Sequence, residues 1–82
     1  MPQYIKVTFQ NNYGEGTKQW QIVDQVCSGN AIWSGYLTYG DSTPELDICS
    51  DDGIYGKVIY QREDGAPTVV DNIQEGSIVR MS

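Results

Sequence analysis

Residues 51–65 of this chain read DDGIYGKVIYQREDG. An Asp-Gly pair stands near each end, at 52–53 and at 64–65, with a mostly apolar run between them. Asp-Gly beside alternating apolar residues is the strongest short-range signal for a β-hairpin turn. The stretch therefore predicts a strand at 54–61 with a tight turn on each side. Gly56, inside that strand, marks a bulge or a close packing contact.

Alternation of apolar and polar residues continues on both sides of this stretch. In a first strand at 4–10, Ile5, Val7 and Phe9 face one way and the residues between them the other. Further strands are predicted at 18–23, 31–39, 46–48, 68–70 and 78–81. We expect one all-β domain over residues 1–82, a small antiparallel β-sandwich or barrel of about seven short strands.

The loops sort into two groups if successive strands run in opposite directions, because alternate connections then lie at the same end of the fold. One end would carry the loops 11–17, 40–45 and 62–67. The other would carry 24–30, 50–53 and 71–77. The second group places Cys27 and Cys49 near one another without assuming a bond between them.

A disulfide between these two cysteines would close a loop of 49 − 27 + 1 = 23 residues. The chain-entropy expression then gives about 3.4 kcal/mol of stabilisation, a large share for so small a domain. The alternative is a pair of free, half-buried thiols in an intracellular protein, which the absence of a secretory pattern in residues 1–6 favours. The compartment stays open, and a bridged pair would favour an extracellular one.

Composition excludes several function classes. Lys and Arg number 5 against 11 Asp and Glu, a net charge of −6, and the five cations are scattered along the chain, so we expect no nucleic-acid binding. No apolar run approaches the roughly 20 residues of a membrane span. There is no histidine, which removes the commonest general base and the Ser-His and Cys-His nucleophile pairs. We therefore expect a protein that is not an enzyme.

The acidic loops are the only candidates for a cation site. Counted from Asp47 as the first position of a calcium loop, Cys49 falls at the third position and Val58 at the twelfth, so the EF-hand pattern fails. A Ca²⁺ site assembled from several loops is the alternative. We favour acids that cap turns and keep the protein soluble, and we expect no metal and no other cofactor.

Aromatic residues provide the main functional signal. Trp20 and Phe9 belong to apolar strand faces and are predicted in the core, whereas Trp33 and Tyr36 lie on opposite faces of one strand. Tyrosine and tryptophan join a flat apolar face to a polar group, which suits sugar rings and protein surfaces. The leading hypothesis is a non-catalytic binding module for a carbohydrate or a protein surface ligand. Its predicted ligand-binding residues are Tyr13, Trp33, Tyr36, Tyr55, Asn11, Asn12, Asp41 and Asp64.

The second hypothesis is a structural or protein-interaction domain, such as an oligomerising subunit or an inhibitor. An edge strand offers a row of unpaired backbone groups to a partner or to a second copy of the chain. The first strand and the apolar run within 77–82 are the expected edges, so a homo-oligomer is a possible outcome.

Overall fold

A computed structural model describes residues 3–14, 16–27 and 29–82. These residues form seven strands and no helix, which confirms the all-β prediction. The strands are β1 (Gln3–Asn11), β2 (Thr17–Asp24), β3 (Ala31–Thr38), β4 (Leu46–Ser50), β5 (Gly56–Arg62), β6 (Thr68–Ile73) and β7 (Ile78–Met81).

Successive strands alternate in direction, although neighbours in sequence are not always neighbours in the sheet. The hydrogen-bonded order is β3-β2-β5-β4-β1-β7, with β6 on β5, and β3 and β7 do not pair, so the sheet is open and is not a closed barrel. Every pair is antiparallel except β1–β7, which is parallel. The expectation of a purely antiparallel sheet was therefore wrong for this pair, because two odd-numbered strands share one direction.

This alternation confirms the predicted sorting of the loops into two ends. It brings Cys27, in the loop after β2, to Cys49 in β4, where the two residues are joined as a disulfide with their Cα atoms 6.0 Å apart. That separation lies within the usual range for a disulfide.

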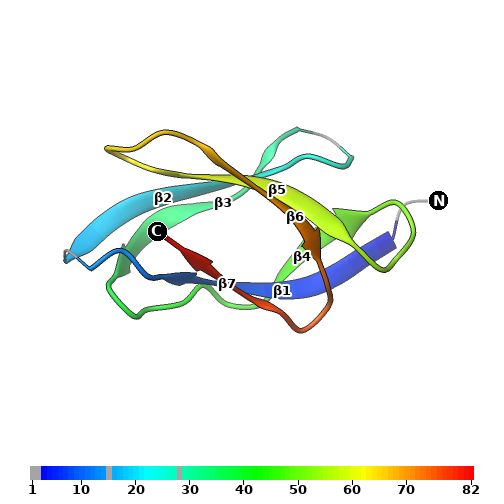
Figure 1. Ribbon diagram of the computed structural model, residues 1–82, viewed down its shortest axis with the longest axis horizontal. Coiled ribbons are helices and arrows are strands. Elements are labelled where there is room, and N and C mark those ends of the chain that lie inside the picture. The colour runs from blue at the N-terminus through cyan, green and yellow to red at the C-terminus, as the bar shows by residue number, and fades with distance from the viewer. Residues whose placement is uncertain (1–2, 15, 28) are drawn as a thin grey trace.

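The strands of the open sheet fall into two groups that are joined at one point. β6, β5, β2 and β3 make one group and β4, β1 and β7 the other, and β4 meets β5 at the single pair Ser50↔Gly56. Figure 1 shows β5 and β6 crossing above β1 and β7. The inward residues of all seven strands meet between them, and the buried cluster consists of Ile5, Val7, Phe9, Trp20, Ile22, Leu37, Ile48, Val58, Tyr60, Ile73 and Met81. The predicted burial of Phe9 and Trp20 is confirmed.

Three strand boundaries differ from the prediction by two residues or more, and the first is that β4 continues to Ser50, past the predicted end at 48. The carboxylate of Asp52 accepts the backbone N–H groups of Ile54 and Tyr55, so these residues belong to a turn and the strand begins at Gly56. Downstream, β6 runs on to Ile73, past the predicted end at 70. Asn72 adopts the left-handed region with φ 55°, and the β5–β6 register shifts between Gly56 and Val58, so β6 accommodates an irregularity that its sequence pattern does not reveal.

Gly56 serves as both the bulge and the close contact that its position predicted. The register of β5 shifts just after it, and a Cβ atom at this position would lie 2.6 Å from Cδ1 of Ile48 and 3.3 Å from Cδ1 of Ile5. Both isoleucines are buried. The two groups of strands approach closely at this point because residue 56 has no side chain.

Replacing Gly56 by alanine should therefore destabilise the domain by about 1–3 kcal/mol, since the core has no room for the added methyl group. Gly14→Ala is the matched control because a Cβ atom there has no neighbour within 4 Å, and its effect should stay within about 0.5 kcal/mol. Urea unfolding followed by tryptophan fluorescence measures both. Equal free energies of unfolding for the two variants would contradict this role for Gly56.

Candidate functional site

The outer face of β3, β2 and β5 carries a shallow groove with polar walls. Trp20 and Ile22 of β2 point into the core, so Gln19 and Gln21 point outward on the same strand. The register sets Gln21 opposite Gln61 of β5 on one side and Ser34 of β3 on the other. The groove has a volume of about 290 Å³ and is lined by Gln19, Trp20, Gln21, Ser34, Gln61, Arg62 and Glu63.

An exposed aromatic ring stands beside these amides. Tyr36 of β3 is directly opposite Gln19 of β2, so both side chains lie on the outer face. Tyr36 is 67 % exposed, the largest value among the exposed large hydrophobic side chains of the described residues. A flat ring next to groups that can both donate and accept hydrogen bonds is therefore presented to solvent.

The amides of the groove differ in how firmly they are held. Nε2 of Gln61 donates a 3.1 Å hydrogen bond to the carbonyl of Gly65, which orients this side chain. Among the described residues, the side-chain amides of Gln19 and Gln21 have no hydrogen-bond partner. Their donors and acceptors are thus available to a ligand without breaking a contact within the protein.

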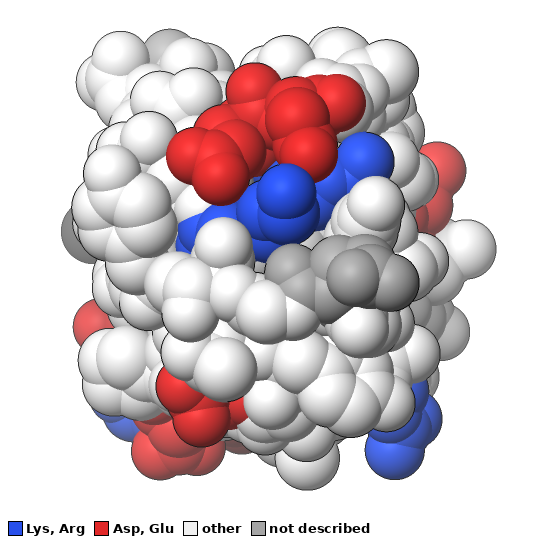
Figure 2. Space-filling view, turned by 90° about the vertical axis from the view of Figure 1, so that its left-hand side faces the viewer, with Lys and Arg blue, Asp and Glu red and all other residues white. Residues whose placement is uncertain are grey.

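A charged cluster lies next to the groove, toward the core side of the sheet, because Arg62 is paired opposite the inward-facing Trp20. The guanidinium carbon of Arg62 lies 3.8 Å from the centre of the Tyr13 ring, a cation–π contact. Asp64 pairs with Arg62 and also with Nζ of Lys18 at 2.9 Å. The hydrogen bond from Lys18, followed by that from Arg62, lowers the pKa of the Asp64 carboxyl to about 2. Figure 2 shows basic and acidic side chains in contact at this end of the molecule.

Asn11 was predicted as a ligand-binding residue and instead holds the backbone together. Its side chain is fully buried. Its Nδ2 donates a 2.9 Å hydrogen bond to the carbonyl of Leu37, and its Oδ1 accepts one of 2.9 Å from the N–H of Tyr13. Both ends of the amide are thus engaged, and the side chain joins the end of β1 to β3.

The predicted aromatic residues are not brought together. Tyr13 and Trp33 are partly buried and pack against the core, and the Trp33 ring covers Gly35. Tyr55 lies in the turn at the opposite end of the fold from Tyr13. Of these four predicted residues, only Tyr36 is exposed on a strand face. Sequence reasoning missed the glutamines, although the polar positions that alternate with Trp20 and Ile22 were a signal that could have found them.

The predicted polar loop residues share one end of the fold with the charged cluster. Asn12 is exposed, and Asp64 belongs to the cluster itself. The carboxylate of Asp41 accepts the N–H of Thr38 at 3.3 Å. At the other end, the N–H groups of Ile54 and Tyr55 lower the pKa of the Asp52 carboxyl. Asp41 and Asp52 thus act as turn caps, the role favoured for loop acids from the sequence.

Comparison with known proteins gives no relative. No family model, curated protein or solved structure matches this chain. Residues 3–14, 16–27 and 29–82 contain no helix with the length and apolar character needed to cross a membrane.

The burial of Asn11 gives a stability prediction. Asn11→Ala leaves the Leu37 carbonyl and the Tyr13 N–H without their partners and should cost about 1–3 kcal/mol of unfolding free energy. Asn12→Ala is the matched control because Asn12 is exposed, and it should change stability by less than about 0.5 kcal/mol. Thermal or urea unfolding of both variants tests this. If the Asn11 variant is as stable as the control, the buried Asn11 side chain does not stabilise the fold.

Proposed function

We propose that this domain is a non-catalytic binding module that takes a carbohydrate on the outer face of β3, β2 and β5. The observation that carries the proposal is the exposed Tyr36 ring directly opposite Gln19, beside a groove lined by three glutamines. The two groups of strands act in this proposal as the layers of an open β-sandwich, with the binding surface on one outer face.

The chemistry of the face suits a sugar better than the other ligand classes. An aromatic ring stacks on the C–H face of a pyranose, and the neighbouring amides match hydroxyl groups that both donate and accept hydrogen bonds. The groove is a shallow surface feature, so it favours an extended ligand lying across the strands. Arg62 is already paired with Asp64 and stacked on Tyr13, which argues against an anion as the main ligand.

The proposal assigns no reaction and no cofactor to the site. The only carboxylate among the groove residues is Glu63, whereas hydrolysis of a glycosidic bond needs a pair of carboxylic acids across the substrate. In this proposal the loop acids cap turns and do not bind Ca²⁺. The role of the face is therefore to hold a ligand, and affinity comes from stacking and hydrogen bonding.

Tyr36→Ala should weaken carbohydrate binding at least about tenfold, because loss of a central aromatic contact typically costs 2 kcal/mol or more and about 1.4 kcal/mol is a factor of ten. The wild-type domain is first screened on an array of immobilised glycans, and the best soluble oligosaccharide is then titrated by calorimetry. Gln19→Ala should weaken the same binding less, since it removes hydrogen bonds alone.

Tyr4→Ala is the matched control for this experiment. Tyr4 is a tyrosine of similar exposure, 62 %, on β1 in the other group of strands. Its variant should bind as the wild type does. Binding that survives Tyr36→Ala, or that falls equally in both variants, would rule out this face as the site, and a domain that binds no glycan on the array would rule out the ligand class.

A second candidate function is association through the open edge of β7. The first strand cannot serve, contrary to the prediction, because β1 lies between β4 and β7. The last strand is an edge: the carbonyls of Ser77 and Met81 accept the N–H groups of Thr8 in β1 and of Asn12 just after it. The backbone groups of residues 78 and 80 therefore point to the open side. Ile78 adds an exposed apolar side chain there.

Arg80→Pro tests this second candidate, because proline removes an outward N–H of the edge. Arg80→Ala is its control, since alanine removes the side chain and keeps the N–H. If the domain self-associates through β7, sedimentation velocity over a wide concentration range should show an oligomer that Arg80→Pro weakens and Arg80→Ala does not. A strict monomer at all concentrations would reject self-association.

A further inference from the structure

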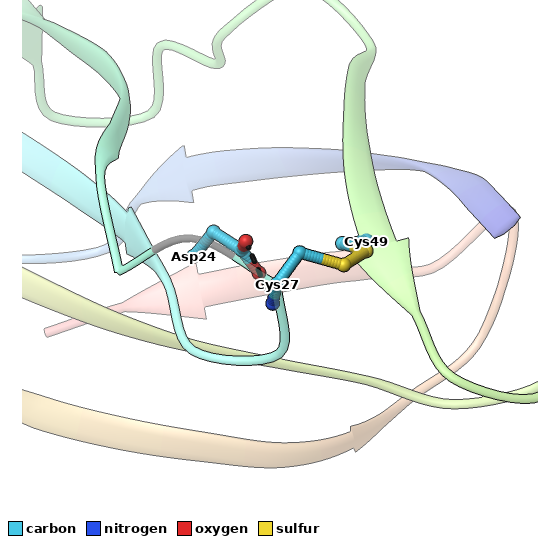
Figure 3. Close-up of side chains that lie close together, drawn as sticks. All are labelled: Asp24, Cys27 and Cys49. Atoms are coloured by element: carbon cyan, nitrogen blue, oxygen red, sulfur yellow. Dashed lines mark hydrogen bonds between the residues drawn. A yellow bond between two sulfur atoms is a disulfide. The ribbon is translucent and has the colours of Figure 1, made fainter. Parts of the chain in front are cut away.

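Two cysteines and a buried carboxylate form a compact cluster at the end of the fold opposite Tyr13. The carboxylate oxygen of Asp24 and the sulfur atoms of Cys27 and Cys49 all lie within 4.8 Å of one another. Figure 3 shows the three side chains converging, with Asp24 at the end of β2, Cys27 on the loop that follows and Cys49 on β4. Carboxylate and thiolate are both ligands of zinc in proteins.

Contacts other than the S–S bond hold these side chains in place. The Asp24 carboxylate accepts the N–H of Val26 at 2.9 Å and of Cys27 at 3.0 Å, so the chain turns back over Asp24. The N–H of Asp24 donates to the carbonyl of Asn30, and that of Gln25 to the carbonyl of Lys57.

The second sulfur is held by the sheet, because Cys49 is in β4, paired opposite Tyr4 of β1. None of these contacts involves a sulfur atom. Breaking the S–S bond therefore leaves these contacts between described residues in place.

The burial of the three groups leaves one open side. Asp24 and Cys49 are each only 3 % exposed, whereas Cys27 is exposed. A cation can thus approach past Cys27 and complete its coordination with water. Zinc sites with three protein ligands and one water are common, and thiolates select soft cations over Mg²⁺ and Ca²⁺.

We propose that the reduced form of this protein binds one thiophilic divalent cation, with Zn²⁺ as the reference, through Asp24, Cys27 and Cys49. A phosphine reductant and one water convert the disulfide to two thiols and yield the phosphine oxide. Zn²⁺ then displaces one proton from each thiol, so two protons are released for each ion bound. The disulfide and the metal are alternative occupants of the same two sulfur atoms.

The experiment uses the full chain in its two redox states, with Co²⁺ as the spectroscopic substitute for Zn²⁺. After reduction by a phosphine without oxygen, Co²⁺ titration should give sulfur-to-cobalt charge-transfer absorption that saturates at one ion per chain and disappears on addition of Zn²⁺. The oxidised protein should give none. Failure of the reduced protein to develop this absorption would overturn the proposal.

Asp24→Asn tests whether the carboxylate is a metal ligand or whether the two thiols bind the ion without it. Asparagine keeps an oxygen for the turn but loses the charge, and the dissociation constant for Co²⁺ should rise at least about tenfold, the size of effect that even groups supporting a metal ligand produce. Asp52→Asn is the matched control, since Asp52 also caps a turn at this end of the fold. Equal affinity in the Asp24 variant and the wild type, or one ion per two chains, would overturn the three-ligand site.

Near-UV circular dichroism of each sample shows whether the reduced protein is folded, so that loss of metal binding can be told apart from unfolding. The reduced protein should retain the spectrum of the oxidised protein or regain it on addition of Zn²⁺. A reduced chain that unfolds and does not recover with Zn²⁺ would also overturn the proposal, because the site depends on the folded loop.

Discussion

The contact between Ser50 and Gly56 is the constraint on which the rest of this fold depends. Among the described residues it is the only register pair between β4 and β5, and so it links the group that contains β1 to the group that contains β2. Ser50 is buried; its hydroxyl donates to the Tyr55 carbonyl at 2.6 Å and accepts the N–H of Gly53 at 3.0 Å. A turn tied internally in this way sets the angle at which the two groups meet, and glycine at position 56 lets them meet closely.

The outer face of β2 follows from that arrangement. Because the chain packs Trp20 and Ile22 into the core, the intervening glutamines face solvent, and pairing on both edges of β2 adds Ser34 and Gln61 to them. The charged cluster of Tyr13, Lys18, Arg62 and Asp64 lies next to this face, toward the core side of the sheet. Strand pairing on both sides of β2 fixes the backbone of this face, whereas the unpaired side chains of Gln19 and Gln21 keep their rotamer freedom.

The two ends of the molecule differ in what their polar residues do. At the end with Tyr13, buried Asn11 and paired Asp64 stabilise loops around the groove. At the other end, Asp24 and Asp52 cap turns beside the disulfide. Of the four loop acids and amides predicted as ligands, Asn11 and Asp41 bond to the backbone and Asp64 pairs with two cations. Short loops in a small domain have few other groups to satisfy their backbone N–H and C=O positions.

The sequence by itself determined the strands and the turns between them, and it placed Cys27 near Cys49 on the condition that successive strands alternate in direction. These follow from period-two patterning and turn residues, which act over a few neighbouring positions. Tertiary structure alone decided the strand order, the parallel β1–β7 pair, and which outward residues share a face. It buried Asn11, placed Tyr55 away from Tyr36 and set Gln61 beside Gln21. Those outcomes depend on how apolar faces pack across the core, and contacts between segments far apart in the chain leave no local trace in the sequence.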